Sequence, residues 1–104
     1  MIALVQDRQA ELRTICAQYH VRRLALFGSA ARGNDFQPGS SDLDFLVEFA
    51  PLQPGQHADH YFGLLAGLER LFQQPVDLLD VAAIHNPYLQ RTVAAGQELL
   101  YEAA

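Results

Sequence analysis

The sequence predicts a small α/β (α+β) domain, in which helices pack on a mixed sheet of about four strands. Stretches with one apolar face at helical spacing alternate along the chain with short apolar runs typical of strands. Proline, glycine, asparagine or aspartate stands between most of these segments, where the chain must turn. The composition is that of a globular protein, because 50% of the residues are hydrophobic and 18% are charged.

In chain order, residues 2–19 predict a helix, because most of their apolar side chains, Cys16 among them, fall on one face. Residues 24–27 form an apolar run that ends at a glycine, which predicts a buried strand. Residues 30–32 follow a potential serine cap and predict a short helix, and residues 34–41 are rich in turn formers and predict a loop.

The second half of the chain continues the alternation of strand and helix, after prolines and a glycine interrupt the chain near residue 55. The expected elements are strands over residues 42–49, 75–81 and 98–101 and helices over residues 58–72 and 86–95. We expect residues 1–104 to form a single domain.

The charge balance narrows the set of partners. The chain has a net charge of −5 and no lysine, so direct binding to duplex DNA or long RNA is not expected. The missing lysine also excludes a Walker-type phosphate loop, which leaves metal ions and backbone amides to hold phosphate. With a single cysteine and no apolar run of the roughly 20 residues that span a bilayer, we expect a cytoplasmic protein without a disulfide or a membrane anchor.

Gly28 and Ser29 form a candidate phosphate-binding turn, where a strand ends and a helix begins. A glycine at this place lets a ligand approach the backbone, and the amides of the next turn attract phosphate. The serine hydroxyl can donate to a phosphate oxygen or cap the helix. The alternative is an ordinary strand-to-helix turn.

Three aspartates are candidate metal ligands. Asp42 and Asp44 are two apart in a strand, so their carboxylates share one face while Leu43 and Phe45 share the other. Such carboxylates repel each other, and a divalent cation such as Mg²⁺ removes that penalty; the alternative is an exposed edge strand with two solvated aspartates. Asp77 lies in an apolar run expected to be a buried strand, where it needs a partner or a metal and would complete a two-metal site.

Other polar side chains are expected to be structural. Asp80 ends the third strand and is expected to cap the residues that follow. His57 and His60 have a spacing that can serve a metal on a helix, but they flank a helix start in a polar stretch. We therefore expect solvated or capping roles for both, and core positions for Tyr61 and Cys16.

Taken together, these segments resemble the signature of the minimal nucleotidyltransferases of the DNA polymerase β-like superfamily. The resemblance rests on LFGSAARG at residues 26–33, SDLDFLV at residues 41–47 and PVD at residues 75–77. The distance between the first two segments is longer than is usual in the family, which we ascribe to a longer loop around residues 36–39.

The resemblance implies a role for each candidate residue. Gly28 and Ser29 would hold the triphosphate of a nucleotide. Asp42 and Asp44 would bind two Mg²⁺ ions, and Asp77 would help to bind one of them and assist deprotonation of the attacking hydroxyl. The implied reaction is the transfer of a nucleoside monophosphate, with ATP as the usual substrate in the family.

The resemblance also implies a partner. Short members of the family are typically antitoxins that form a hetero-oligomer with a HEPN-type ribonuclease toxin and adenylylate one of its tyrosines. Arg32 is implied to contact the triphosphate or, alternatively, to lie solvated at a helix end. Two other functions stay open: a catalytically silent antitoxin that acts by binding, and a small-molecule nucleotidyltransferase with a separate acceptor-binding subunit.

Overall fold

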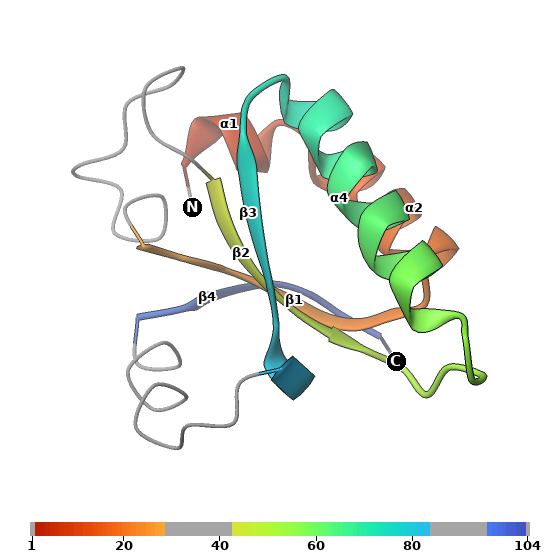
Figure 1. The fold of residues 1–104 in the computed structure, drawn as a ribbon. Coiled ribbons are helices and arrows are strands. Elements are labelled where there is room, and N and C mark those ends of the chain that lie inside the picture. The colour runs from red at the N-terminus through yellow and green to blue at the C-terminus, as the bar shows by residue number, and fades with distance from the viewer. Residues whose placement is uncertain (1, 29–42, 84–95, 104) are drawn as a thin grey trace.

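The computed structural model describes residues 2–28, 43–83 and 96–103. The chain order of the elements in Figure 1 is α1 (Ala3–Gln6), α2 (Gln9–Gln18), β1 (Val21–Phe27), β2 (Leu43–Phe49), α4 (His57–Phe72), β3 (Val76–Asp80), the 3₁₀ helix η1 (Val81–Ala83) and β4 (Glu98–Glu102). The elements expected at residues 30–32, 34–41 and 86–95 lie outside the described residues.

The described strands form one mixed sheet in the order β3-β2-β1-β4. β1 is antiparallel to both of its neighbours, and β2 is parallel to β3. The parallel pair needs a crossover, which α4 provides. The predicted α/β class and the mixed four-stranded sheet are therefore confirmed.

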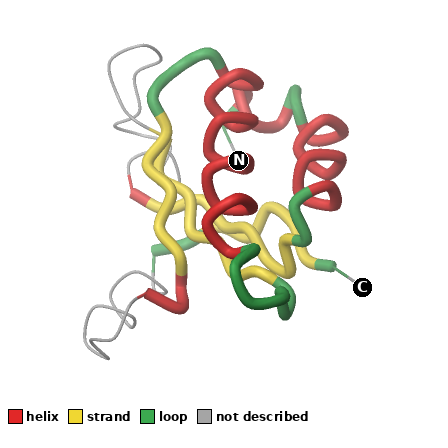
Figure 2. Tube along the Cα trace, turned by 45° about the vertical axis from the view of Figure 1, so that its right-hand side comes forward, coloured by secondary structure: helices red, strands yellow, loops and turns green. Residues whose placement is uncertain are grey.

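The main core lies between the sheet and the helices α2 and α4, which cover the same face (Figures 1 and 2). Alternate residues of β2, Leu43, Phe45 and Val47, are fully buried on this side. The ring of Phe45 lies 5.8 Å from that of Phe72, which comes from the last turn of α4. Cys16 of α2 is fully buried in the same core, as the sequence predicts.

A smaller apolar cluster lies on the opposite face of the sheet. Its buried members are Ala25 and Leu46, against which Phe27, Leu79 and Val81 pack. In β2, Leu46 therefore faces away from the two long helices. The residues of β2 that alternate with Leu43, Phe45 and Val47 lie on the same side of the sheet as Leu46. This second face carries the candidate site.

Two differences from the expected elements exceed one residue. The helix expected over residues 2–19 is interrupted at Asp7 and Arg8, where the chain changes direction between α1 and α2 (Figure 1). Val5 of α1 is nevertheless buried in the same core as α2, and Ile2 packs against this core. β1 begins at Val21 rather than residue 24, because its first residues include exposed arginines that do not read as an apolar run.

The interruption and the early strand start leave the order of elements unchanged. Among the described residues, no helix is long and apolar enough to cross a membrane.

Candidate functional site

Gly28 and Asp44 lie against each other at one end of the sheet. Phe27, the last residue of β1, is the register partner of Asp44 in the antiparallel neighbour β2, and Gly28 follows it directly. A Cβ atom at Gly28 would collide with Oδ2 of Asp44 and would lie 3.3 Å from its Cγ. Gly28 also has a φ of +70°, in the region that other residues rarely adopt. Space and backbone conformation thus both require glycine at this position.

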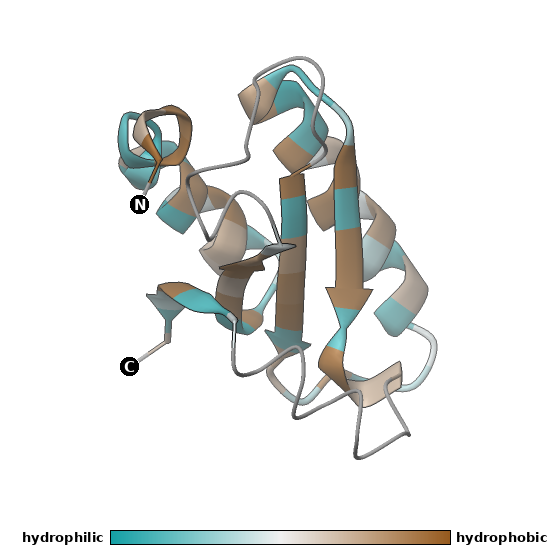
Figure 3. Cartoon of the chain, turned by 90° about the vertical axis from the view of Figure 1, so that its left-hand side faces the viewer, coloured by the Kyte–Doolittle hydropathy of each residue, from teal (hydrophilic) through white to brown (hydrophobic). Residues whose placement is uncertain are grey.

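Asp77 is the register partner of Asp44 in the parallel strand β3. Partners in adjacent strands are about 4.8 Å apart and project from the same face, so the two carboxylates are neighbours. They share this face with Leu46 and Leu79, on the side away from α2 and α4. In Figure 3, the hydrophobic ribbon of two neighbouring strands is interrupted by a hydrophilic band on each.

The surroundings of the two carboxylates differ. β2 lies between β1 and β3, so the interior position expected for the strand of Asp44 is confirmed, and Asp44 is half-buried. The expected burial of the strand of Asp77 is wrong: β3 stands at the edge of the sheet that the described strands form, and Asp77 is exposed. The helices cover only the other face of β3, where Leu78 is buried. Proximity to Asp44, and not burial, therefore makes Asp77 a candidate ligand.

The oxygens of Asp44 and Asp77 are suited to a hard divalent cation. The negative charges of two neighbouring carboxylates repel each other, and a cation that binds oxygen ligands, such as Mg²⁺, relieves this repulsion. Within residues 2–28, 43–83 and 96–103, no group of three metal-binding side chains is placed to hold an ion. The predicted third ligand, Asp42, lies outside these residues, as do Ser29 and Arg32.

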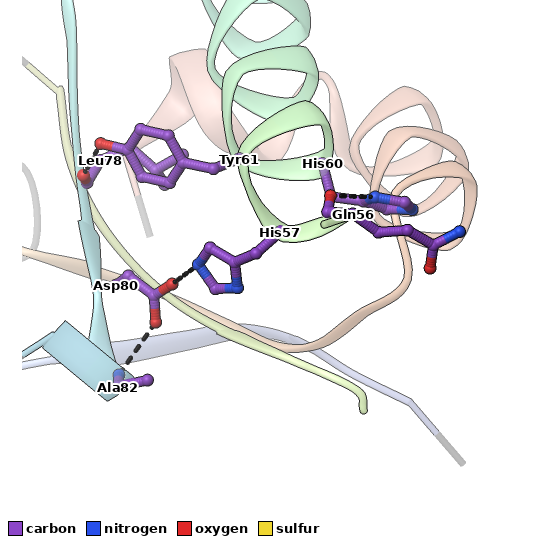
Figure 4. Close-up of polar contacts among 7 residues, drawn as sticks. All are labelled: Gln56, His57, His60, Tyr61, Leu78, Asp80 and Ala82. Atoms are coloured by element: carbon purple, nitrogen blue, oxygen red, sulfur yellow. Dashed lines mark hydrogen bonds and ion pairs between the residues drawn. The ribbon is translucent and has the colours of Figure 1, made fainter. Parts of the chain in front are cut away.

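Tyr61 is a residue near the site whose role the sequence interpretation missed. It was expected in the core, and it packs against the core while its hydroxyl donates a hydrogen bond of 2.5 Å to the carbonyl of Leu78, next to Asp77 (Figure 4). Partial burial raises the pKa of Tyr61, and the charges of Asp77 and Asp80 raise it further. Buried tyrosine hydroxyls usually find a partner, which is the signal that could have revealed this link between α4 and β3.

Asp80 and His57 form a separate polar contact at the opposite end of β3. Nε2 of His57 lies 2.6 Å from Oδ2 of Asp80, whose Oδ1 accepts a 2.9 Å hydrogen bond from the backbone amide of Ala82 (Figure 4). The capping role expected for Asp80 is confirmed. A cavity of about 340 Å³ lies beside this contact, between the end of β2 and the turn that precedes α4, away from Gly28 and Asp44.

Comparison with known proteins shows the family to which the chain belongs. Residues 10–104 match the family model described as "Polymerase beta, Nucleotidyltransferase". A protein of Methanocaldococcus jannaschii named "Putative protein adenylyltransferase MJ1379" is 37% identical over 84 residues, which cover 81% of this chain and 79% of that protein. A second protein of the same organism, "Putative protein adenylyltransferase MJ0128", is 36% identical over 86 residues, with the same coverage.

Solved structures extend the likeness to the fold. One described as "Structure of putative minimal nucleotidyltransferase" has a TM-score of 0.75 and 28% identity, and the match covers 93% of this chain and 95% of that one. A further match is a chain in the structure of a tri-AMPylated HEPN toxin of Shewanella oneidensis in complex with an MNT antitoxin. Its TM-score is 0.64 at 18% identity, which shows the fold alone, and the match covers 94% of this chain and 72% of that one. The chain belongs to the polymerase β nucleotidyltransferase family.

Proposed function

We propose that the protein is a Mg²⁺-dependent adenylyltransferase that transfers AMP from ATP to a tyrosine hydroxyl of a partner toxin of the HEPN type. The observation that carries this proposal is the placement of the Asp44 carboxylate against the backbone of Gly28 and beside Asp77. It brings a turn that a phosphate can approach closely next to oxygens that can hold a cation.

One group of residues would bind the triphosphate, and a second group would bind the metal ions. The backbone at Gly28, free of a side chain, and the hydroxyl of Ser29 would bind the triphosphate, with Arg32 near its outer phosphates. Asp42, Asp44 and Asp77 would hold two Mg²⁺ ions, which supply neutralisation of the charge that develops on the phosphate oxygens.

The reaction would be an in-line displacement. The acceptor oxygen forms a bond to the α-phosphorus, the bond from this phosphorus to the bridging oxygen breaks, and pyrophosphate leaves. The proton of the hydroxyl passes to a carboxylate, and Asp77 is the proposed acceptor because it is the exposed member of the pair. Positioning and charge neutralisation would account for most of the acceleration.

The relatives of this chain support a protein as the acceptor. Its M. jannaschii relatives are named as protein adenylyltransferases, and a structure with the same fold holds an MNT antitoxin bound to an AMPylated HEPN toxin.

The test measures the intact mass of the partner toxin after incubation with this protein and Mg²⁺-ATP. We expect a mass gain of one AMP or more with the native protein and none with the double variant Asp42→Ala/Asp44→Ala. Asp59→Asn is the matched control, because it removes an exposed carboxylate of α4 outside the candidate site.

The outcomes separate the candidate functions. A stable complex without a mass gain would refute the proposal and favour an antitoxin that acts by binding alone. Pyrophosphate release that depends on Asp44 and on an added small-molecule hydroxyl compound, without any partner protein, would instead favour a small-molecule acceptor.

A further inference from the structure

The imidazoles of His20 and His60 face each other across two elements that are 40 residues apart in sequence. His20 lies in the turn between α2 and β1, and His60 lies in the first turn of α4. Nδ1 of His20 is 3.0 Å from Nε2 of His60, while the ring centroids are 5.1 Å apart. Because the nitrogens are closer together than the centroids, the nitrogen-bearing edges of the rings face each other.

The hydrogen bonds of His60 determine which nitrogen is available. Its Nδ1 lies 2.9 Å from the carbonyl oxygen of Gln56 (Figure 4), which can only accept, so this nitrogen carries a proton. In this tautomer Nε2 has a lone pair, and it accepts the 3.0 Å hydrogen bond that Nδ1–H of His20 donates. A backbone carbonyl that receives the other ring N–H is the usual support of a metal-binding histidine, because it sets the tautomer and the ring orientation.

The backbone and a neighbouring ring also hold the pair in place. His20 has a φ of +57°, and its carbonyl accepts a 2.9 Å hydrogen bond from the amide of Ala50, which ties the turn to the end of β2. Tyr19 meets the ring of His60 edge-on, with centroids 6.3 Å apart. The two imidazoles therefore project toward each other from backbone positions that are fixed independently.

We propose that His20 and His60 form a binding site for Zn²⁺ on the protein surface. Two nitrogens that each bind a tetrahedral Zn²⁺ at about 2.0–2.1 Å are about 3.3 Å apart, close to the 3.0 Å observed here. When Zn²⁺ binds, His20 changes tautomer: its Nδ1 gives up a proton to solvent, and its Nε2 takes one up. Nδ1 can then bind the ion, and the charge of each ring stays the same.

The site supplies two protein ligands, and water would fill the remaining positions. Such an ion binds more weakly than in the three- or four-ligand sites typical of zinc enzymes and zinc fingers, which suits reversible binding. It would connect the α2–β1 turn to the start of α4 and would stabilise the folded protein in proportion to its occupancy.

The experiment titrates the purified 104-residue protein with Zn²⁺ in excess Mg²⁺, which would fill the proposed carboxylate site. Calorimetry follows binding, and NMR follows the histidine ring signals. We expect one Zn²⁺ per chain, with the ring signals of His20 and His60 shifting together. His20→Ala and His60→Ala should each weaken binding by about tenfold or more.

The controls remove the other histidines one at a time. His57→Ala and His85→Ala should bind Zn²⁺ as the native protein does, and circular dichroism should show that every variant is folded. Unchanged binding in His20→Ala and His60→Ala, or an equal loss in His57→Ala, would overturn the proposal. None of these readouts depends on transferase activity.

Discussion

Replacing Gly28 by alanine tests the candidate site at its most constrained point. The added Cβ would meet the carboxylate of Asp44, and the residue would keep a φ of +70°. A left-handed backbone costs a residue with a side chain about 1–2 kcal/mol. Displacing the Asp44 side chain from its rotamer adds about 0.5–1.5 kcal/mol. We therefore expect Gly28→Ala to lower the free energy of unfolding by about 2–3 kcal/mol.

Gly55 offers a matched control for the backbone contribution. Its φ is +86°, and a Cβ there would have no atom within 4 Å, so Gly55→Ala incurs the backbone cost without the collision. Urea unfolding of both variants should show Gly28→Ala to be less stable by about 1 kcal/mol. The excess should shrink when Asp44→Ala is added, because the colliding atoms are then gone.

The same variant should also affect activity. A shift of catalytic groups by about 1 Å can lower the rate by about 10²-fold, so Gly28→Ala should lose at least this much AMP transfer while Gly55→Ala keeps native activity. Equal stability of the two glycine variants, or no recovery of stability on adding Asp44→Ala, would refute the placement of the Asp44 carboxylate against Gly28.

Three further predictions concern stability, each measured by urea unfolding. Tyr61→Phe removes the hydrogen bond to Leu78 and should cost about 1 kcal/mol. His57→Ala leaves the buried carboxylate of Asp80 with the Ala82 amide but without the imidazole, and should cost about 1–3 kcal/mol; no loss would mean that the 2.6 Å contact contributes nothing. Burial raises the pKa of Cys16 to about 12. Between about pH 9 and 12 the thiol therefore ionises in the unfolded chain but not in the folded protein, and the free energy of unfolding falls by up to about 1.4 kcal/mol per pH unit as the pH rises. Cys16→Ala should show a flatter dependence of stability on pH over this range.

The two-residue period of a β-strand correctly predicted the face of the sheet on which each side chain of β2 lies. Leu43 and Phe45 were expected opposite Asp44, and both are fully buried under the helices, while Asp44 lies on the other side with Leu46. The two-residue period is a property of the extended backbone itself, so local sequence contains it. The capping role of Asp80 was predictable for the same reason, since its hydrogen bond reaches only two residues along the chain.

The pairing of one strand with another could not be predicted from the local sequence pattern. The run Val76-Asp77-Leu78-Leu79 predicts a buried strand, yet among the described strands β3 lies at the edge of the sheet, and its Asp77 is exposed. Whether an apolar run lies in the middle or at the edge of a sheet depends on the strands that pair with it, and these come from distant parts of the chain. The interruption of the first helix was likewise not contained in the local pattern, which places the apolar residues of both halves mostly on one face.

Residue types, their order and the face on which each side chain lies were thus contained in the chain of amino acids, because backbone geometry repeats every two or 3.6 residues. The side chains that each of them contacts could not be predicted from the sequence. The position of Asp44 against Gly28, its register with Asp77, and the pairing of His20 with His60 all arise when segments far apart in sequence are brought together. Burial of a shared core drives that association, and it acts on the molecule as a whole.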